Sequence, residues 1–132
     1  MKTTEVEYQA IIEYCRELFT KKNQDYGTSW RILRLPSITD QLYIKAQRIR
    51  TIQEKGSQKV QDGITDEFVG IINYCVMALI QIARQDQTAE PEVGTLTTLY
   101  DEQVKEVREL LFNKNHDYGE AWRTMRVSSM TD

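Results

Sequence analysis

The chain has 132 residues, of which 40% are hydrophobic, so it can form one domain with a real core and is too short to favour two. Its 17 basic and 20 acidic residues leave a net charge of −3, which disfavours a nucleic-acid partner and restricts phosphate binding to a local cluster. The N-terminus has no apolar signal core, and the longest apolar run, 75–80, is too short to span a membrane. Cys15 and Cys75 lie among apolar residues, which predicts core thiols in a reducing compartment. A cytoplasmic protein is therefore expected.

Four helices are predicted in chain order, and no segment alternates as a strand does. Capping boxes, Thr4-x-x-Glu7 and Ser37-x-x-Asp40, mark the expected starts of the first two. The third is the most apolar and should be the central buried element. The expected fold is an all-α, antiparallel bundle of about four helices. Their approximate ranges are 4–23, 37–55, 63–85 and 98–115.

The chain contains an internal repeat. The segment 22–40 returns as 114–132, with eleven of 19 positions identical. A repeat of this length indicates a tandem duplication of one helical unit. We therefore divide the chain into a complete first repeat over 1–86, a linker over 87–97, and a second repeat over 98–132 that holds only the first helix and the loop motif. The incomplete second repeat either packs on the first or on a neighbouring chain, or belongs to a longer protein.

The best-kept part of the repeat, Lys22 to Arg31, is called the loop motif below. As a binding loop, it would offer polar contacts from Asn23 and Asp25, a stacking face from Trp30 and a phosphate fork from Arg31. All four residue types recur in the second copy, whereas some of their neighbours differ. This difference favours a functional role for the asparagine, the aspartate and the arginine.

A purely structural interpretation of the same motif stays open. Gly27 can end the preceding helix in the left-handed conformation, with Tyr26 and Trp30 anchored in the core. His116, the only histidine, aligns with Gln24, so it is not expected to act as a general base. No phosphate-binding glycine loop, zinc pattern or Ser/His/Asp set is present in the sequence.

Lys45 is the most unusual cation in the second predicted helix. Leu42, Lys45 and Ile49 fall on one face at helical spacing, which brings the lysine to the core side. Its ammonium group either extends to the surface or converges with Arg48 and Arg31 on a phosphate. Both alternatives are compatible with the sequence.

Acidic residues gather at the start of the third predicted helix. Asp62 and Asp66 are one turn apart, with Glu67 beside them, so the two aspartates could share a Mg²⁺ ion that also contacts substrate phosphates. Alternatively, these acids only stabilise the helix N-terminus through its dipole. Mg²⁺ is the cofactor expected if the chain is an enzyme.

The loop motif, followed by Thr39-Asp40, Lys45-x-x-Arg48-Ile49 and Ile71-Ile72-Asn73-Tyr74, resembles the nucleotide modification associated domain, type one. The resemblance covers most of 10–85 and, for its first half, 100–132. It implies an all-α unit of phage and bacterial proteins that is suspected of acting on nucleotides, with a distant likeness to MazG-like pyrophosphohydrolases. The resemblance also implies a third acid, one turn after Asp66, at the position where this chain has Gly70. By this resemblance the substrate-binding candidates are Lys22, Asn23, Tyr26, Trp30, Arg31, Arg48, Asn73 and Tyr74.

Two hypotheses follow. In the first, the protein binds a nucleotide and hydrolyses it with Mg²⁺; Asp25 and Lys45 are the catalytic candidates, and Asp62 and Asp66 would hold the metal. This requires helix packing to bring Asp25, Lys45 and Asp66 into one polar hollow. In the second, the chain is a non-catalytic helical binding or assembly module. In either case the predicted fourth helix lacks partner helices for its apolar stripe, so a homodimer is expected.

Overall fold

The computed structural model describes residues 3–27, 29–56, 63–84 and 93–131. These residues confirm the predicted all-α fold, since four long helices pack together and no strand occurs among them. The long helices are α1 (Thr3–Tyr26), α2 (Leu35–Lys55), α3 (Ile64–Ala83) and α4 (Val93–Tyr118). Shorter elements are the 3-10 helices η1 (Ser29–Ile32) and η2 (Ala121–Thr124), and α5 (Val127–Thr131).

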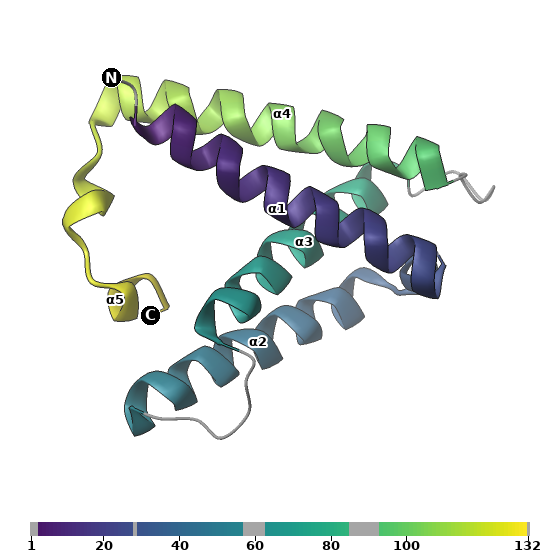
Figure 1. Ribbon diagram of the computed structural model, residues 1–132, viewed down its shortest axis with the longest axis horizontal. Helices are drawn as coiled ribbons and strands as arrows, with labels where there is room; N and C mark the ends of the chain where they lie inside the picture. Colours follow the sequence, from purple (N-terminus) through teal and green to yellow (C-terminus); the bar gives the residue numbers. More distant parts are fainter. Residues whose placement is uncertain (1–2, 28, 57–62, 85–92, 132) are drawn as a thin grey trace.

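The long helices form two antiparallel pairs (Figure 1). In one pair, α1 and α4 lie side by side and run in opposite directions. In the other pair, α2 and α3 form a hairpin, in which α3 also contacts α1 and α4. The helix that is most apolar in sequence is therefore the central one, as predicted.

The main core lies where α3 meets both α1 and α4. Its side chains come from both repeats, because α4 supplies Leu96, Tyr100 and Val104 next to Phe19 of α1. Each fully buried large side chain of this kind stabilises the fold by about 1.5–3 kcal/mol. The first repeat therefore depends on the helix of the second repeat for part of its core.

The two loop motifs end their helices in the same way. Gly27 has a φ of 71°, and its N–H donates to the carbonyl oxygen of Asn23 at 2.9 Å. Gly119 has a φ of 76°, and its N–H donates to the carbonyl oxygen of Asn115 at 2.8 Å. Because this φ region favours glycine, a glycine at this position ends both α1 and α4.

The start of α2 differs from the prediction. The helix begins at Leu35 with Pro36 in its first turn, and no side chain caps it. Ser37 therefore lies inside the helix, and the predicted capping box from Ser37 to Asp40 is wrong. Proline has no N–H to leave unpaired and has a helical φ, so it starts the helix without that cap.

Two further predictions need correction. Helix α4 begins at Val93, inside the segment predicted as a linker, because Leu96 is fully buried against the core. Cys15 is buried as predicted, whereas Cys75 is exposed. Apolar residues cover more than one face of α3, so periodicity alone could not tell which face would be covered.

Among the described helices, α3 is the one long and apolar enough to cross a membrane. The uninterrupted run 75–80 understates this length, because the helix extends through Ile64–Ala83. A helix at the centre of a globular core meets the same criterion, and α3 packs against α1, α2 and α4. Its composition therefore matches its position in the fold.

Candidate functional site

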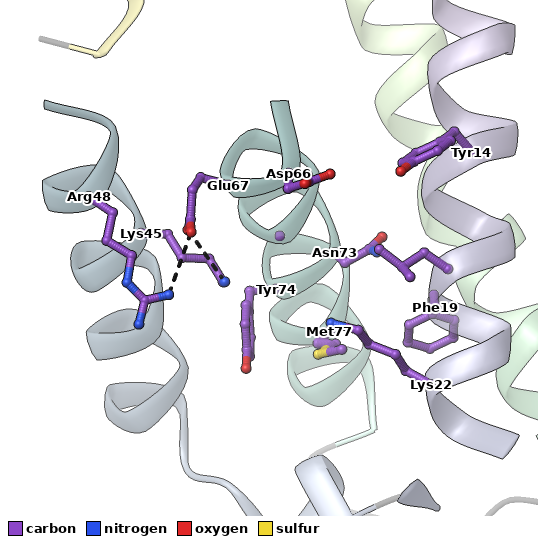
Figure 2. A pocket seen from close by; sticks show the side chains of 12 residues that line it. Tyr14, Phe19, Lys22, Lys45, Arg48, Asp66, Glu67, Asn73, Tyr74 and Met77 are labelled. Carbon is purple, nitrogen blue, oxygen red and sulfur yellow. Dashed lines mark ion pairs between the residues drawn. The ribbon is translucent and has the colours of Figure 1, made fainter. Parts of the chain in front are cut away.

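A pocket of about 360 Å³ lies between α1, α2 and α3 (Figure 2). All the helices that line it belong to the first repeat. Helix α1 contributes Tyr14, Leu18, Phe19 and Lys22; α2 contributes Lys45 and Arg48; and α3 contributes Asp66, Glu67, Gly70, Asn73, Tyr74 and Met77.

The spacing of the lining residues explains why they share a pocket. On α3, Glu67, Gly70, Tyr74 and Met77 recur every three or four residues and so follow one face of the helix. On α2, Lys45 lies three residues from a second cation, Arg48, so both can approach the same side of α3. The packing of α2 on α3 then brings these two faces together.

A buried carboxylate organises the cations of the pocket. Glu67 Oε2 lies 3.7 Å from Lys45 Nζ, and Glu67 Oε1 lies 3.6 Å from Arg48 Nη1 (Figure 2). The Glu67 side chain is only 10% exposed. Burial of a charged group is costly unless opposite charges accompany it, and the two cations offset that cost. Oε2 has no hydrogen-bond partner among the described groups.

Gly70 makes room for Lys45. A Cβ atom at this position would lie 2.7 Å from Lys45 Cε and 2.9 Å from Lys45 Nζ. The lysine side chain therefore crosses α3 directly over the glycine, and its Nζ lies 5.7 Å from the centroid of the Tyr74 ring. Gly70, the position at which the family resemblance implies a carboxylate, thus has a structural role next to Glu67.

Asn73 joins three helices at the inner wall of the pocket. Its Nδ2 donates to the Cys15 carbonyl oxygen at 3.1 Å, and its Oδ1 accepts from the Tyr100 hydroxyl at 2.8 Å. Burial raises the pKa of Tyr100 above its ordinary value, which keeps this hydroxyl protonated as a donor. The second repeat therefore supports the pocket wall through Tyr100.

The loop motif folds on itself and does not line this pocket. Asn23 is buried; its Nδ2 donates to the Phe19 carbonyl oxygen at 2.7 Å, and its Oδ1 accepts from Trp30 Nε1 at 2.8 Å. The rings of Trp30 and Phe19 are 5.9 Å apart between centroids. The same bond joins Trp122 Nε1 to Asn115 Oδ1 at 3.1 Å in the second repeat. These contacts give the asparagine and the tryptophan a structural role.

Of the other predicted site residues, some line the pocket and some do not. The Arg31 guanidinium lies 5.9 Å from the centroid of Trp30 and is outside the pocket lining, as is the exposed Asp25. Asp62 and the Tyr26 side chain lie outside the described residues. Of Asp25, Lys45 and Asp66, only the last two line the pocket, so the requirement that all three meet in one polar hollow is not met by Asp25. The predicted site residues that the structure brings together there are Lys22, Lys45, Arg48, Asp66, Asn73 and Tyr74.

Sequence reasoning did not assign Glu67 to the site and treated it only as one of several acids at a helix start. Its spacing to Gly70 and Tyr74, three and seven residues on, was the signal that could have identified it. Tyr14 and Met77 were missed as well. Nothing in the sequence distinguishes these two from other amphipathic or core positions.

The carboxylates at the pocket would supply only some of the ligands of a metal ion. In the described ranges of the chain, no three Asp, Glu, His or Cys side chains form a group that could hold one. Asp66 and Glu67 both line the pocket. Mg²⁺ commonly takes one or two protein carboxylates together with water and substrate phosphates, so Asp66 is a suitable single ligand for such an ion.

Comparisons with known proteins give one family. No curated protein and no solved structure matches the chain. The model of Nucleotide modification associated domain 1 matches residues 22–82 and, a second time, 114–132. Together these segments include more than half of the chain, all the lining residues from α2 and α3, and both loop motifs. The chain therefore belongs to the nucleotide modification associated domain 1 family.

Proposed function

We propose that the pocket between α1, α2 and α3 binds a nucleotide. The observation that carries this proposal is that three cations, Lys22, Lys45 and Arg48, line one pocket together with the rings of Tyr14 and Tyr74. Lysine and arginine are the usual partners of phosphate groups, and aromatic rings offer a stacking face for a base. A volume of about 360 Å³ is at the lower end of the usual range for small-molecule sites.

The charges of the pocket suit an anionic ligand. Glu67 is paired with Lys45 and Arg48 only at 3.6–3.7 Å, beyond hydrogen-bond distance, so the N–H groups of these cations can turn towards a phosphate. Lys22 adds a third positive charge from α1, across the pocket from α2 (Figure 2). A triphosphate would contact cations from both sides.

Calorimetric titration with a panel of nucleoside triphosphates, with and without Mg²⁺, tests nucleotide binding. Lys45→Met keeps the length of the side chain and removes its charge, so we expect at least a roughly tenfold loss of affinity, as for a charge-assisted contact. Lys105→Met, at an exposed position on α4 outside the pocket, is the matched control and should bind as the wild type does. The absence of binding for every nucleotide, or equal binding by both variants, would contradict the proposal.

Gly70→Ala provides a second variant at the same place. The new methyl group would meet Lys45 at less than 3 Å and force the lysine side chain away from α3. We expect weaker nucleotide binding with little change in the circular dichroism spectrum. Unchanged affinity would show that the position of Lys45 is unimportant for the ligand.

For the reaction, we propose Mg²⁺-dependent hydrolysis of the nucleoside phosphate, in a form that uses Lys45 and Asp66 and assigns no role to Asp25. Asp66 would hold the ion, with Asp62 as the second carboxylate suggested by the sequence. The bound ion would neutralise phosphate charge and polarise a phosphoryl oxygen. Lys45 and Arg48 would stabilise the negative charge that develops during the reaction. Phosphate and pyrophosphate release by the wild type should be lost in Asp66→Asn and kept in Asp25→Asn, since Asp25 is outside the pocket lining.

The second candidate function is a non-catalytic nucleotide-binding module. The position of Lys45 over Gly70 favours it, because the lysine side chain fills the space at the position where the family resemblance implies a third acid. Nucleotide affinity that is independent of Mg²⁺, without release of phosphate or pyrophosphate, would support this alternative. Turnover that requires both Mg²⁺ and Asp66 would exclude it.

A further inference from the structure

The second half of α4 has an uncovered apolar face. In its first half, one face packs against the core, and Leu96 and Tyr100 are fully buried there. In the second half, Val107 is 41% and Leu110 is 55% exposed, while Leu111 is half-buried. We call Val107, Leu110 and Leu111 the α4 face.

The internal repeat indicates what would cover the α4 face. Its three residues align with Cys15, Leu18 and Phe19 of α1, which lie on the side of α1 that faces α3. Cys15 is 0% exposed, whereas its counterpart Val107 is 41% exposed. The difference arises because the first repeat has an α2–α3 hairpin over this position and the second repeat has none within the described residues.

The loop motifs differ in the same direction. Trp30 is 9% exposed and its counterpart Trp122 is 36% exposed. Ile38, in the first turns of α2, is 1% exposed, and its counterpart Met130 is 50% exposed. Apolar side chains that the hairpin buries in the first repeat are therefore open to solvent in the second.

Because α1 and α4 are antiparallel, the two helices together form two faces, one at each end of the pair. At one end, α3 covers a face made of the second half of α1 and the first half of α4. The second half of α4 lies beside the first half of α1 in an equivalent way (Figure 1). There Tyr8, the counterpart of Tyr100, is half-buried and donates its hydroxyl to the Val104 carbonyl oxygen at 3.0 Å. Tyr100 instead donates to Asn73 of the hairpin.

We propose that the α4 face docks a helical hairpin of the α2–α3 type. Its docking helix would carry an apolar stripe like that of Val76 and Ile80, with an asparagine in the place of Asn73 to accept from Tyr8. The partner is thus a polypeptide with the sequence pattern of residues 35–83. This proposal rests on the repeat and its exposure pattern, and does not depend on nucleotide binding.

The test presents this hairpin to the whole chain in two ways. In one, a peptide of residues 35–83, which contains no tryptophan, is titrated against the protein while the fluorescence of its two tryptophans is recorded. Trp30 is already buried, so a shift on binding is assigned to the more exposed Trp122. In the other, residues 41–83 are appended after Asp132, which continues the second repeat in the register of the first because Asp132 aligns with Asp40. Amide hydrogen exchange over 104–118 is measured in both.

We expect a blue shift of the fluorescence and slower exchange over 104–118 in at least one of the two arrangements. Leu110→Asp should reduce both effects by roughly tenfold or more, as for a contact at the centre of an interface. The matched control, Ile82→Asp, changes a similarly exposed apolar residue of α3, outside α4 and the first half of α1, and should behave as the wild type does. Unchanged exchange in both arrangements would overturn the proposal.

A second copy of the chain is the alternative occupant of the α4 face. Analytical ultracentrifugation of the unmodified protein would then give a dimer that Leu110→Asp dissociates, and the peptide would not displace the second copy. That result would also overturn the hairpin proposal. A monomer that binds the peptide supports it.

Discussion

The two repeats share a loop motif and differ in what covers it. In both, a glycine with positive φ ends the helix and an asparagine side chain accepts a hydrogen bond from the tryptophan seven residues later. Trp30 is buried in the core, whereas Trp122 is only partly covered. The loop has the same helix end and the same hydrogen bond whether its tryptophan is buried or partly exposed, so the motif itself specifies this local fold. The pocket needs α2 and α3, which only the first repeat has in the described structure.

The largest expected difference between the repeats concerns the tryptophans. Trp30→Ala removes a large core side chain and should lower the free energy of unfolding by about 3–5 kcal/mol. Trp122→Ala removes a partly exposed ring with one hydrogen bond and should cost about 1 kcal/mol. Urea unfolding measures both values. Equal losses would mean that the second loop is as well packed as the first.

The paired tyrosines provide a smaller contrast. Tyr100→Phe leaves the buried Asn73 Oδ1 without its donor, and we expect a loss of about 1–3 kcal/mol in the free energy of unfolding. Tyr8 donates to a backbone carbonyl oxygen at a less buried position, so Tyr8→Phe should cost less than about 1 kcal/mol. Urea unfolding at neutral pH compares them. A larger loss in Tyr8→Phe would contradict the assignment of the more strongly buried hydrogen bond to Tyr100 and Asn73.

Stability at alkaline pH should depend on the same pair. Burial raises the pKa of Tyr100, and also that of Tyr8, where the charge of Arg108 opposes the increase. Above about pH 10 the unfolded chain loses tyrosine protons that the folded chain retains, so the free energy of unfolding should fall as the pH rises. Below that pH, the two tyrosines are protonated in both states and do not change the free energy of unfolding with pH. Tyr100→Phe should flatten the decrease more than Tyr8→Phe, and an unchanged slope would contradict the buried donor.

The smallest expected effect concerns an ion pair between the repeats. Arg16 of α1 contacts Asp101 of α4 through two hydrogen bonds of 2.7 and 3.1 Å. Both side chains are about half exposed, so water and salt screen the pair. Asp101→Asn should reduce the free energy of unfolding by less than about 1 kcal/mol, and less at high salt. A loss that is large and independent of salt would show that this contact holds the repeats together.

Much of the fold could be predicted from the sequence because helices leave a periodic signal. The apolar spacing identified all four long helices, and the composition of α3 identified the central one. Helix starts were less reliable, since Pro36 began α2 without the expected Ser37 cap and Leu96 drew residues of the predicted linker into α4. These outcomes depend on backbone chemistry and on tertiary burial that periodicity does not report.

The candidate site was predictable only in part. Lys45 could be identified because a lysine on the core side of a helix is unusual. Its pairing with Glu67 and its passage over Gly70 depend on how α2 crosses α3, which no local pattern specifies. The loop motif attracted a functional interpretation because it recurs, yet a hydrogen bond between Asn23 and Trp30 accounts for two of its kept residues. Residues that recur in both repeats of one chain can therefore be kept for folding as well as for binding or catalysis.

The number of nucleotide sites per chain tests the central claim most directly, because the account assigns the pocket to the first repeat alone. Calorimetry should give one site per chain. Lys22→Ala should weaken binding, whereas Lys114→Ala, at the aligned position of the second repeat, should leave it unchanged. Two sites per chain, or equal losses in the two variants, would contradict the account.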